Sequence, residues 1–370
     1  MYLKDKWLFK ENIAAANSSL FILTMQWTKK RINNLLFLVG VVFVVVMIFT
    51  FDVSFTELWQ YILDAGKWMI AIVGVWFLVY GINALSWRQV IRGNSKDADK
   101  VGFWRIFKLT ITGYALNYAT PVGGLGGEPY RILELSRDIN KQEATSSVIL
   151  YAMMHIFAHF WLWFTSIFLW LGLVAYGDPD VKLTPLYGTL LGIAFVFCLI
   201  AFYLFSRGYK NGLVVKTIRL IGKIPGLKDW SQRFLEQHSE SLQNVDRQIA
   251  ALHKQDKKAF YSSFLLEYFS RIVQSLEIMF MLLSIGINCG GGIEGYMLTF
   301  LHSILILAFT SLFANLIGFL PLQLGVQESG FMLSIAALGL SGATGLFVSI
   351  ICRVREIIWI IVGLVLMKIK

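Results

Sequence analysis

The chain has 370 residues, of which 56% are hydrophobic and only 15% are charged. This composition excludes an ordinary soluble enzyme and indicates a polytopic membrane protein. The net charge of +10 does not predict nucleic-acid binding, because Lys and Arg are concentrated in three segments between apolar runs, as in the cytoplasmic loops of membrane proteins.

The first part of the chain is predicted to form a tail and one membrane half. We expect residues 1–33 to be a basic cytoplasmic tail on the membrane surface. Residues 34–206 are predicted to form the first membrane half. Its spans cover 35–51, 68–87, 144–176 and 186–206, and its acidic outer loop covers 52–66.

The rest of the chain is predicted to contain a cytoplasmic loop and a second membrane half. Residues 207–258 are rich in Lys and Arg, and an amphipathic helix is expected near 230–252. Residues 259–370 form the second half, with spans over 260–285 and 346–367. These charges predict cytoplasmic N- and C-termini and a multi-pass location in the cytoplasmic (inner) membrane.

Two stretches interrupt the apolar pattern with residues that break helices. In hydrocarbon, such a break survives only when it is buried in protein or faces a watery cavity. In both stretches a glutamate, Glu128 or Glu328, follows a proline by seven positions. The break residues are Asn117, Pro121, Gly123, Gly124, Gly126 and Gly127 in the first stretch, and Asn315, Pro321 and Gly325 in the second.

The flanking charges predict that the two breaks open in opposite directions. Basic residues flank the hairpin near 109–135, which we expect to enter from the cytoplasm and return there. The hairpin near 297–340 lies in a region without Lys or Arg and is expected to enter from outside. The fold class is therefore an all-α polytopic helix bundle with two broken or re-entrant hairpins in an inverted-topology repeat. Alternatively, residues 297–320 are long enough to cross the membrane completely.

Charged residues inside apolar segments are the candidate substrate-binding or gating groups. They are Glu128, Arg131, Glu328, Arg353, Arg355 and Glu356. The two glutamates are predicted either to carry protons or to cap the half-helices that follow them. The arginines are predicted either to contact a phosphate or to form internal ion pairs with a glutamate from a broken segment.

Other ionisable residues receive simpler interpretations. Glu267 and Arg271 are four positions apart and are expected to pair with each other, whereas Glu277 has no evident local partner. His155 and His159 are expected to pack or to form hydrogen bonds between helices. No metal site, cofactor or catalytic residue is predicted, and the glycine-rich stretch matches no nucleotide-binding motif.

The two break motifs and the Arg353-Val-Arg355-Glu356 run resemble a known family. This family is the integral-membrane domain of the lysylphosphatidylglycerol synthetases, also called multiple peptide resistance factors, and its stand-alone relatives. The resemblance covers residues 34–368, with departures at Leu322, Gln323 and Gln327. It implies a helical bundle that moves lipids between leaflets. We expect a stand-alone member without the soluble aminoacyltransferase domain.

The favoured hypothesis is a transporter rather than an enzyme. It would be a flippase or scramblase that moves a phospholipid or polyprenyl-phosphate-type lipid between leaflets of the cytoplasmic membrane. The alternatives are an intramembrane transferase that acts on a lipid headgroup, and a membrane scaffold for a lipid-modifying enzyme. The expected partners are membrane lipids with a phosphate-bearing headgroup, together with a possible partner enzyme or second copy of the chain, and no nucleic acid.

Overall fold

The structure, a computed structural model, describes residues 55–119, 126–211, 257–316 and 326–369 continuously, together with short stretches between 34 and 42 and between 215 and 247. Every regular element in these ranges is helical. The helices are α2 (Phe55–Ala65), α3 (Trp68–Asn94), α4 (Phe103–Tyr118), α5 (Gly127–Leu135), α6 (Lys141–Tyr176), α7 (Pro185–Asn211), α10 (Lys257–Ser284), α11 (Gly292–Leu316), α12 (Val326–Ala337) and α13 (Gly342–Lys368), with a short 3-10 turn, η1 (Ala98–Lys100).

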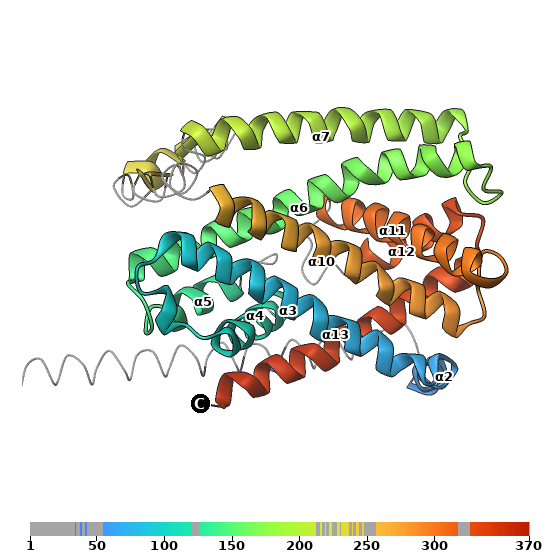
Figure 1. Cartoon of the computed structure of the whole chain (residues 1–370), viewed down its shortest axis with the longest axis horizontal. Coiled ribbons are helices and arrows are strands. Elements are labelled where there is room, and N and C mark those ends of the chain that lie inside the picture. Colours follow the sequence, from blue (N-terminus) through green and yellow to red (C-terminus); the bar gives the residue numbers. More distant parts are fainter. Residues whose placement is uncertain are drawn as a thin grey trace, which may run out of the picture.

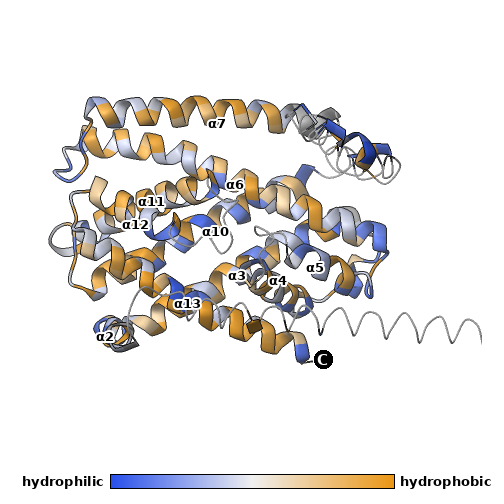
Figure 2. Cartoon of the chain, turned by 180° about the vertical axis from the view of Figure 1, so that it is seen from behind, coloured by the Kyte–Doolittle hydropathy of each residue, from blue (hydrophilic) through white to orange (hydrophobic). Residues whose placement is uncertain are grey.

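Four helices are long and apolar enough to cross a membrane: α3, α6, α7 and α11. Helices α10 and α13 have 28 and 27 residues, but each carries charged side chains in its middle turns. In Figure 2, apolar residues dominate α7, and hydrophilic segments lie at helix ends and on α10 and α13 within the bundle. The predicted all-α polytopic membrane protein is confirmed.

The predicted and observed elements differ at several places. The outer loop expected over 52–66 contains a helix, α2, with an amphipathic sequence. Helix α11 has 25 residues, so by length it fits the alternative of a complete crossing better than a half-crossing. The expected tail over 1–33 and nearly all of the span over 35–51 lie outside the described residues, as does most of the expected amphipathic helix over 230–252.

The two broken hairpins point in opposite directions through the bundle. The start of α4 and the end of α5 lie at one end of the molecule, and α11 starts and α12 ends at the other (Figure 1). Lys108 on α4 donates to the carbonyl of Ile369, so we call the first end the C-terminal face. At the opposite face, His302 on α11 contacts Asp178 in the α6–α7 turn.

Helix packing repeats between the two halves. Helix α3 packs on α4 as α10 packs on α11, and α5 packs on α6 as α12 packs on α13. Each hairpin also packs on the other half: α4 lies against α13, and α11 lies against α6. Helices α3 and α10 share the most extensive contact. The halves are thus interlocked around the α3–α10 pair, which is the arrangement expected for an inverted repeat.

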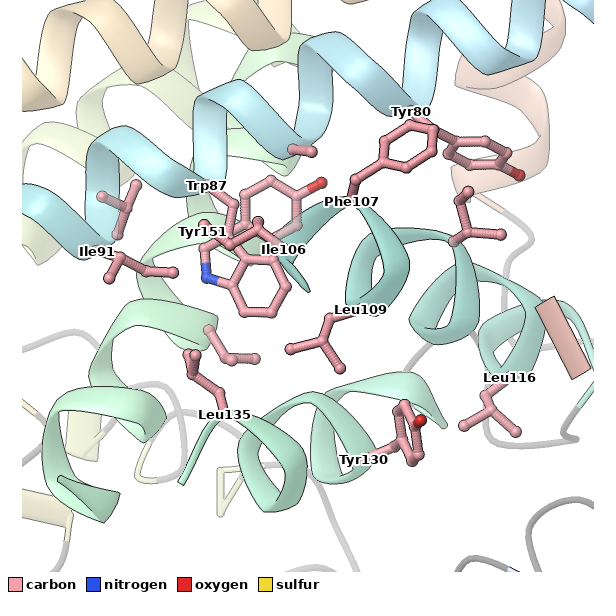
Figure 3. Packing of buried hydrophobic residues seen from close by; sticks show 14 of the residues in the cluster. Tyr80, Trp87, Ile91, Ile106, Phe107, Leu109, Leu116, Tyr130, Leu135 and Tyr151 are labelled. Carbon is pink, nitrogen blue, oxygen red and sulfur yellow. The ribbon is translucent and has the colours of Figure 1, made fainter. Parts of the chain in front are cut away.

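Small and aromatic residues hold these helices together. On the α3–α10 contact, the Ser86 hydroxyl lies 2.9 Å from the Ser263 hydroxyl, and both side chains are fully buried. Small polar residues of this kind allow close helix approach in membranes. Figure 3 shows the core around α4 and α5, where Trp87 of α3 stacks on Tyr151 of α6 at a centroid distance of 5.4 Å. This packing fixes the first hairpin against the bundle.

Candidate functional site

A cavity of about 550 Å³ lies between the two broken hairpins. Residues from both membrane halves line it, on helices α3 to α7 and α10 to α13. Aromatic side chains cover part of its wall, and charged or amide side chains project from the hairpins and from α10 and α13. The charged lining residues are Glu128, Arg131, Arg271, Glu277, Arg353, Arg355 and Glu356, and His155 and His159 also contribute.

Asn117 bridges the first break. Its side-chain oxygen accepts a hydrogen bond from the backbone N–H of Gly127 at 2.5 Å, and its amide nitrogen donates to Glu128 at 3.2 Å. The first N–H groups of a helix have no partner within the helix, so Asn117 stabilises the start of α5 from the end of α4. The second carboxylate oxygen of Glu128 is buried and has no hydrogen-bond partner among the described residues.

Arg131 is held by the backbone of α4. Its guanidinium donates to the carbonyl of Thr110 at 3.2 Å and pairs with Glu128 at 3.1 Å. The side chain passes directly over Gly113, where a Cβ atom would lie 2.0 Å from Arg131 Nε. A Cβ on Gly127 would likewise lie 2.0 Å from the Gly113 carbonyl oxygen. Two glycines therefore allow the close α4–α5 approach that places this arginine.

The second break connects to α13 through ion pairs. Glu328, at the start of α12, accepts from Arg353 Nε at 3.0 Å. Arg353 also pairs with Glu356 at 3.0 Å, and Gln327 donates to the other oxygen of Glu356 at 3.2 Å. Arg353 and Glu356 are each 3% exposed, whereas the Glu328 side chain is 29% exposed. The network therefore extends from a buried core to the partly exposed start of α12.

Arg355 forms a deeply buried pair in this region. Its Nε lies 2.6 Å from Glu277 Oε1, and its guanidinium lies 4.0 Å from the centroid of the Trp76 ring. Trp76 donates to the other oxygen of Glu277 at 2.7 Å. Glu277 thus receives donors from both α13 and α3. Charge-assisted hydrogen bonds of this type are strong when they are shielded from water.

Arg271 has a different environment from the other cavity arginines. Among the described residues, no carboxylate lies within ion-pair distance of its guanidinium, and its Nε has no hydrogen-bond partner. It contacts Gln274 at 2.7 Å and His155 Nε2 at 2.5 Å, and His155 Nδ1 lies 2.8 Å from Glu267. A neutral imidazole that donates through Nδ1 and accepts through Nε2 satisfies both contacts. The direct Glu267–Arg271 pair predicted from spacing is therefore wrong, because His155 lies between the two residues.

The structure brings most of the predicted site residues to this one cavity. Five of the six line its wall, and the sixth, Glu328, adjoins it through Arg353. Of the predicted break residues, Asn117, Gly126, Gly127 and Asn315 lie at helix ends on the two sides of the breaks. The remaining break residues, Pro121, Gly123, Gly124, Pro321 and Gly325, lie outside the described residues.

The sequence interpretation missed several cavity residues. Arg271 was interpreted as locally paired and His155 as packed or hydrogen-bonded between helices, and Gln274 was not considered. Charge at the centre of an apolar helix was a signal for the α10 site. Tyr114 and Tyr118 follow α4 toward the break and line the same cavity. Among the described residues, three of the four cavity arginines form ion pairs with carboxylates, and Arg271 does not. This combination creates a site suited to an anion with several oxygen atoms.

These features define a polytopic helical membrane protein whose two interlocked halves enclose a charged cavity. The chain belongs to the family described as the lysylphosphatidylglycerol synthase TM region, whose model matches residues 37–364. No curated protein and no solved structure matches the chain. Membership of this family gives the protein a membrane lipid-related role.

Proposed function

We propose that the protein moves phosphate-bearing lipids between membrane leaflets, with the headgroup in the central cavity and the acyl or prenyl tails in the bilayer. The observation that carries this proposal is Arg271, a cavity cation with no carboxylate partner among the described residues. Its link to a carboxylate runs only indirectly, through His155 to Glu267. Charge at such depth without a direct ion pair is costly and usually serves a substrate or transport. The family, the repeated half-helices and the cavity between them support the same function.

The cavity fits a lipid headgroup better than it fits a whole lipid. Its volume of about 550 Å³ is within the range of small-molecule sites, and its aromatic wall includes Trp76, Tyr114 and Trp163. Arginine presents a planar set of donors that matches phosphate oxygens. We therefore assign phosphate contact first to Arg271, and then to Arg131 and Arg353 as their glutamate partners move away.

The two break glutamates act as internal substitutes for the phosphate. Glu128 pairs with Arg131, and Glu328 pairs with Arg353, one pair at each hairpin. When a phosphate reaches one hairpin, it displaces that carboxylate, which then turns away from its arginine. Because the hairpins open toward opposite faces, one exchange at each end completes a crossing. The distribution of Lys and Arg favours a location in the cytoplasmic (inner) membrane, with the C-terminal face toward the cytoplasm.

The test is lipid translocation by the purified full-length chain in vesicles. Four labelled lipids serve as probes: a zwitterionic phospholipid, an anionic phospholipid, a polyprenyl phosphate and a glycolipid without phosphate. We expect movement of at least one phosphate-bearing lipid and none of the phosphate-free glycolipid. Equal movement of the glycolipid would contradict phosphate recognition.

Two variants separate the site from general effects on the fold. Arg271→Gln removes the cavity cation and is expected to abolish movement, whereas Arg271→Lys keeps the charge and retains part of it. Arg105→Gln is the matched control, because Arg105 pairs with Glu134 and Asp138 outside the cavity. A normal rate for Arg271→Gln, in protein that elutes as a single folded species, would overturn the assignment. No movement of any lipid by the folded wild type would refute transport and favour a transferase, which lipid mass spectrometry would detect.

A further inference from the structure

A second cluster of functional side chains lies at the opposite face of the bundle, outside the lipid cavity. It contains Asp178 and Asp180 in the α6–α7 turn, Cys289 between α10 and α11, and His302 on α11. The ligand atoms of Asp180, Cys289 and His302 all lie within 4.8 Å of one another. A carboxylate, a thiol and an imidazole at this separation form a donor set that zinc prefers.

The histidine is oriented as a metal ligand would be. His302 Nε2 lies 2.8 Å from Asp178 Oδ2, and its Nδ1 lies 3.2 Å from Cys289 Sγ. His302 and Asp178 are buried, and their side chains are each 1% exposed. When the Nε2 proton is donated to Asp178, the Nδ1 lone pair faces the thiol. A carboxylate behind a ligating histidine is the usual second contact of a zinc site, because it fixes the tautomer and raises the basicity of the ring.

The backbone fixes the other two ligands. Asp178 Oδ1 accepts from the backbone N–H of Asp180 at 2.9 Å, which orders the turn that carries the Asp180 carboxylate. The Cys289 N–H donates to the Thr299 hydroxyl on α11 at 3.0 Å. Cys289 and Asp180 are partly exposed, so an ion and a water molecule can reach them from this face. The ligands thus come from separate segments that the fold has already positioned.

We propose that Asp180, Cys289 and His302 bind a zinc ion, with Asp178 as the orienting carboxylate. On binding, the Cys289 thiol releases its proton to solvent, and its sulfur and His302 Nδ1 both coordinate the metal. Zinc–ligand bonds are about 2.0–2.3 Å long, so ligand atoms around one ion lie roughly 3–4 Å apart and the three groups close only slightly. The ion joins the α6–α7 turn of the first half to α11 of the second. It would therefore tie the two halves together at the face opposite the C-terminus.

Cobalt substitution tests this site without any transport assay. Purified full-length protein in detergent is reduced, freed of the reductant under an oxygen-free atmosphere, and titrated with Co²⁺ alone. The expected result is one Co²⁺ per chain with a sulfur-to-cobalt charge-transfer band, displaced by Zn²⁺. Cys289→Ser should abolish the band, and Cys198→Ser and Cys352→Ser should retain it, because these buried cysteines lie away from the cluster.

A second set of variants separates metal binding from loss of fold. Asp180→Asn changes a ligand that is partly exposed. Asp178→Asn changes only the orienting carboxylate, and this variant should weaken Co²⁺ affinity about 10–100-fold. Zn²⁺ should raise the unfolding temperature of the wild type and leave that of Cys289→Ser unchanged. Absence of a thiolate–cobalt band in the wild type, or its persistence in Cys289→Ser, would overturn the proposal. Neither result bears on lipid movement, so this site and the proposed function fail separately.

Discussion

Removal of either partner of the Glu277–Arg355 pair should destabilise the protein strongly. Glu277→Gln keeps the shape of the side chain and an acceptor for Trp76. The Arg355 guanidinium then has only the more distant carboxylate of Glu356 among the described residues, with 3.9 Å between Arg355 Nη1 and Glu356 Oε1. Arg355→Met keeps an apolar chain over the Trp76 ring and leaves the Glu277 carboxylate without this cation. Both charges are at most 3% exposed. Breaking a buried pair from one side costs about 3–5 kcal/mol.

The double variant should cost less than the sum of the two single variants. With both changes, neither charge of the pair remains to be compensated, and the glutamine side chain that replaces Glu277 still accepts a hydrogen bond from the indole. Contacting residues of this type show coupling of about 0.5–3 kcal/mol in double-mutant cycles. The measurement is the free energy of unfolding of the four proteins in mixed detergent micelles.

A solvent-exposed pair provides the control for this cycle. Lys100 and Asp97 lie 2.8 Å apart with side chains that are 65% and 47% exposed. Asp97→Asn should therefore cost only about 0–1 kcal/mol. If Glu277→Gln or Arg355→Met cost no more than this control, or if the two effects simply added, the pair would not be the shielded interaction described above.

Three further substitutions test the construction of the site by thermal unfolding. Gly127→Ala places a Cβ 2.0 Å from the Gly113 carbonyl oxygen and should lower the free energy of unfolding by about 1–3 kcal/mol. Gly172 has open space around it, so Gly172→Ala should change the free energy of unfolding by no more than about 0.5 kcal/mol. Equal effects of the two substitutions would refute the close-approach argument. Asn117→Ala loses the hydrogen bond to the start of α5 and should cost about 0.5–2 kcal/mol, and an unchanged unfolding temperature would contradict its capping position. His155→Leu leaves two buried polar partners unsatisfied and should cost about 1–3 kcal/mol, and an unchanged unfolding temperature would contradict its bridging position.

The apolar runs and the glycine and proline residues predict most of the fold. Of the six predicted spans, those over 68–87, 144–176 and 186–206 coincide with helices long and apolar enough to cross a membrane, and those over 260–285 and 346–367 coincide with α10 and α13. The breaks were predicted because a helix in hydrocarbon must satisfy its own backbone, and their opposite directions were predicted from the flanking charges. Helix α2 was missed because three acidic residues in a short segment suggested an outer loop, whereas Trp59, Leu63 and their neighbours form an apolar face. Charge counting gives topology but not the local conformation of the connecting segments.

Partner choice in the site could not be predicted from spacing. Arg271 and Glu267 are four residues apart, yet an imidazole from α6 separates them. Glu277 finds its cation 78 positions later, on a helix of the same half that crosses α10. The cluster of Asp180, Cys289 and His302 could not be predicted from spacing either. Cys289 is far in sequence from the other two cysteines, and its neighbours in the cluster are a carboxylate and an imidazole rather than thiols. Interhelical contacts in a bundle depend on crossing geometry, which composition and periodicity do not contain.

The pairing of the cavity charges has a consequence for the proposed lipid transport. Arg131, Arg353 and Arg355 already hold carboxylates, so the charges of these three cavity arginines are compensated without a ligand. In the proposed transport, a phosphate that is bound at Arg271 gains Arg131 or Arg353 only by replacing a carboxylate, and the replaced glutamate must turn away from its arginine. A ligand shifts a conformational equilibrium only through its different affinity for the two states. In the proposed transport cycle, displacement of Glu128 or Glu328 would supply such a difference at each hairpin and would link headgroup binding to the opening of one face.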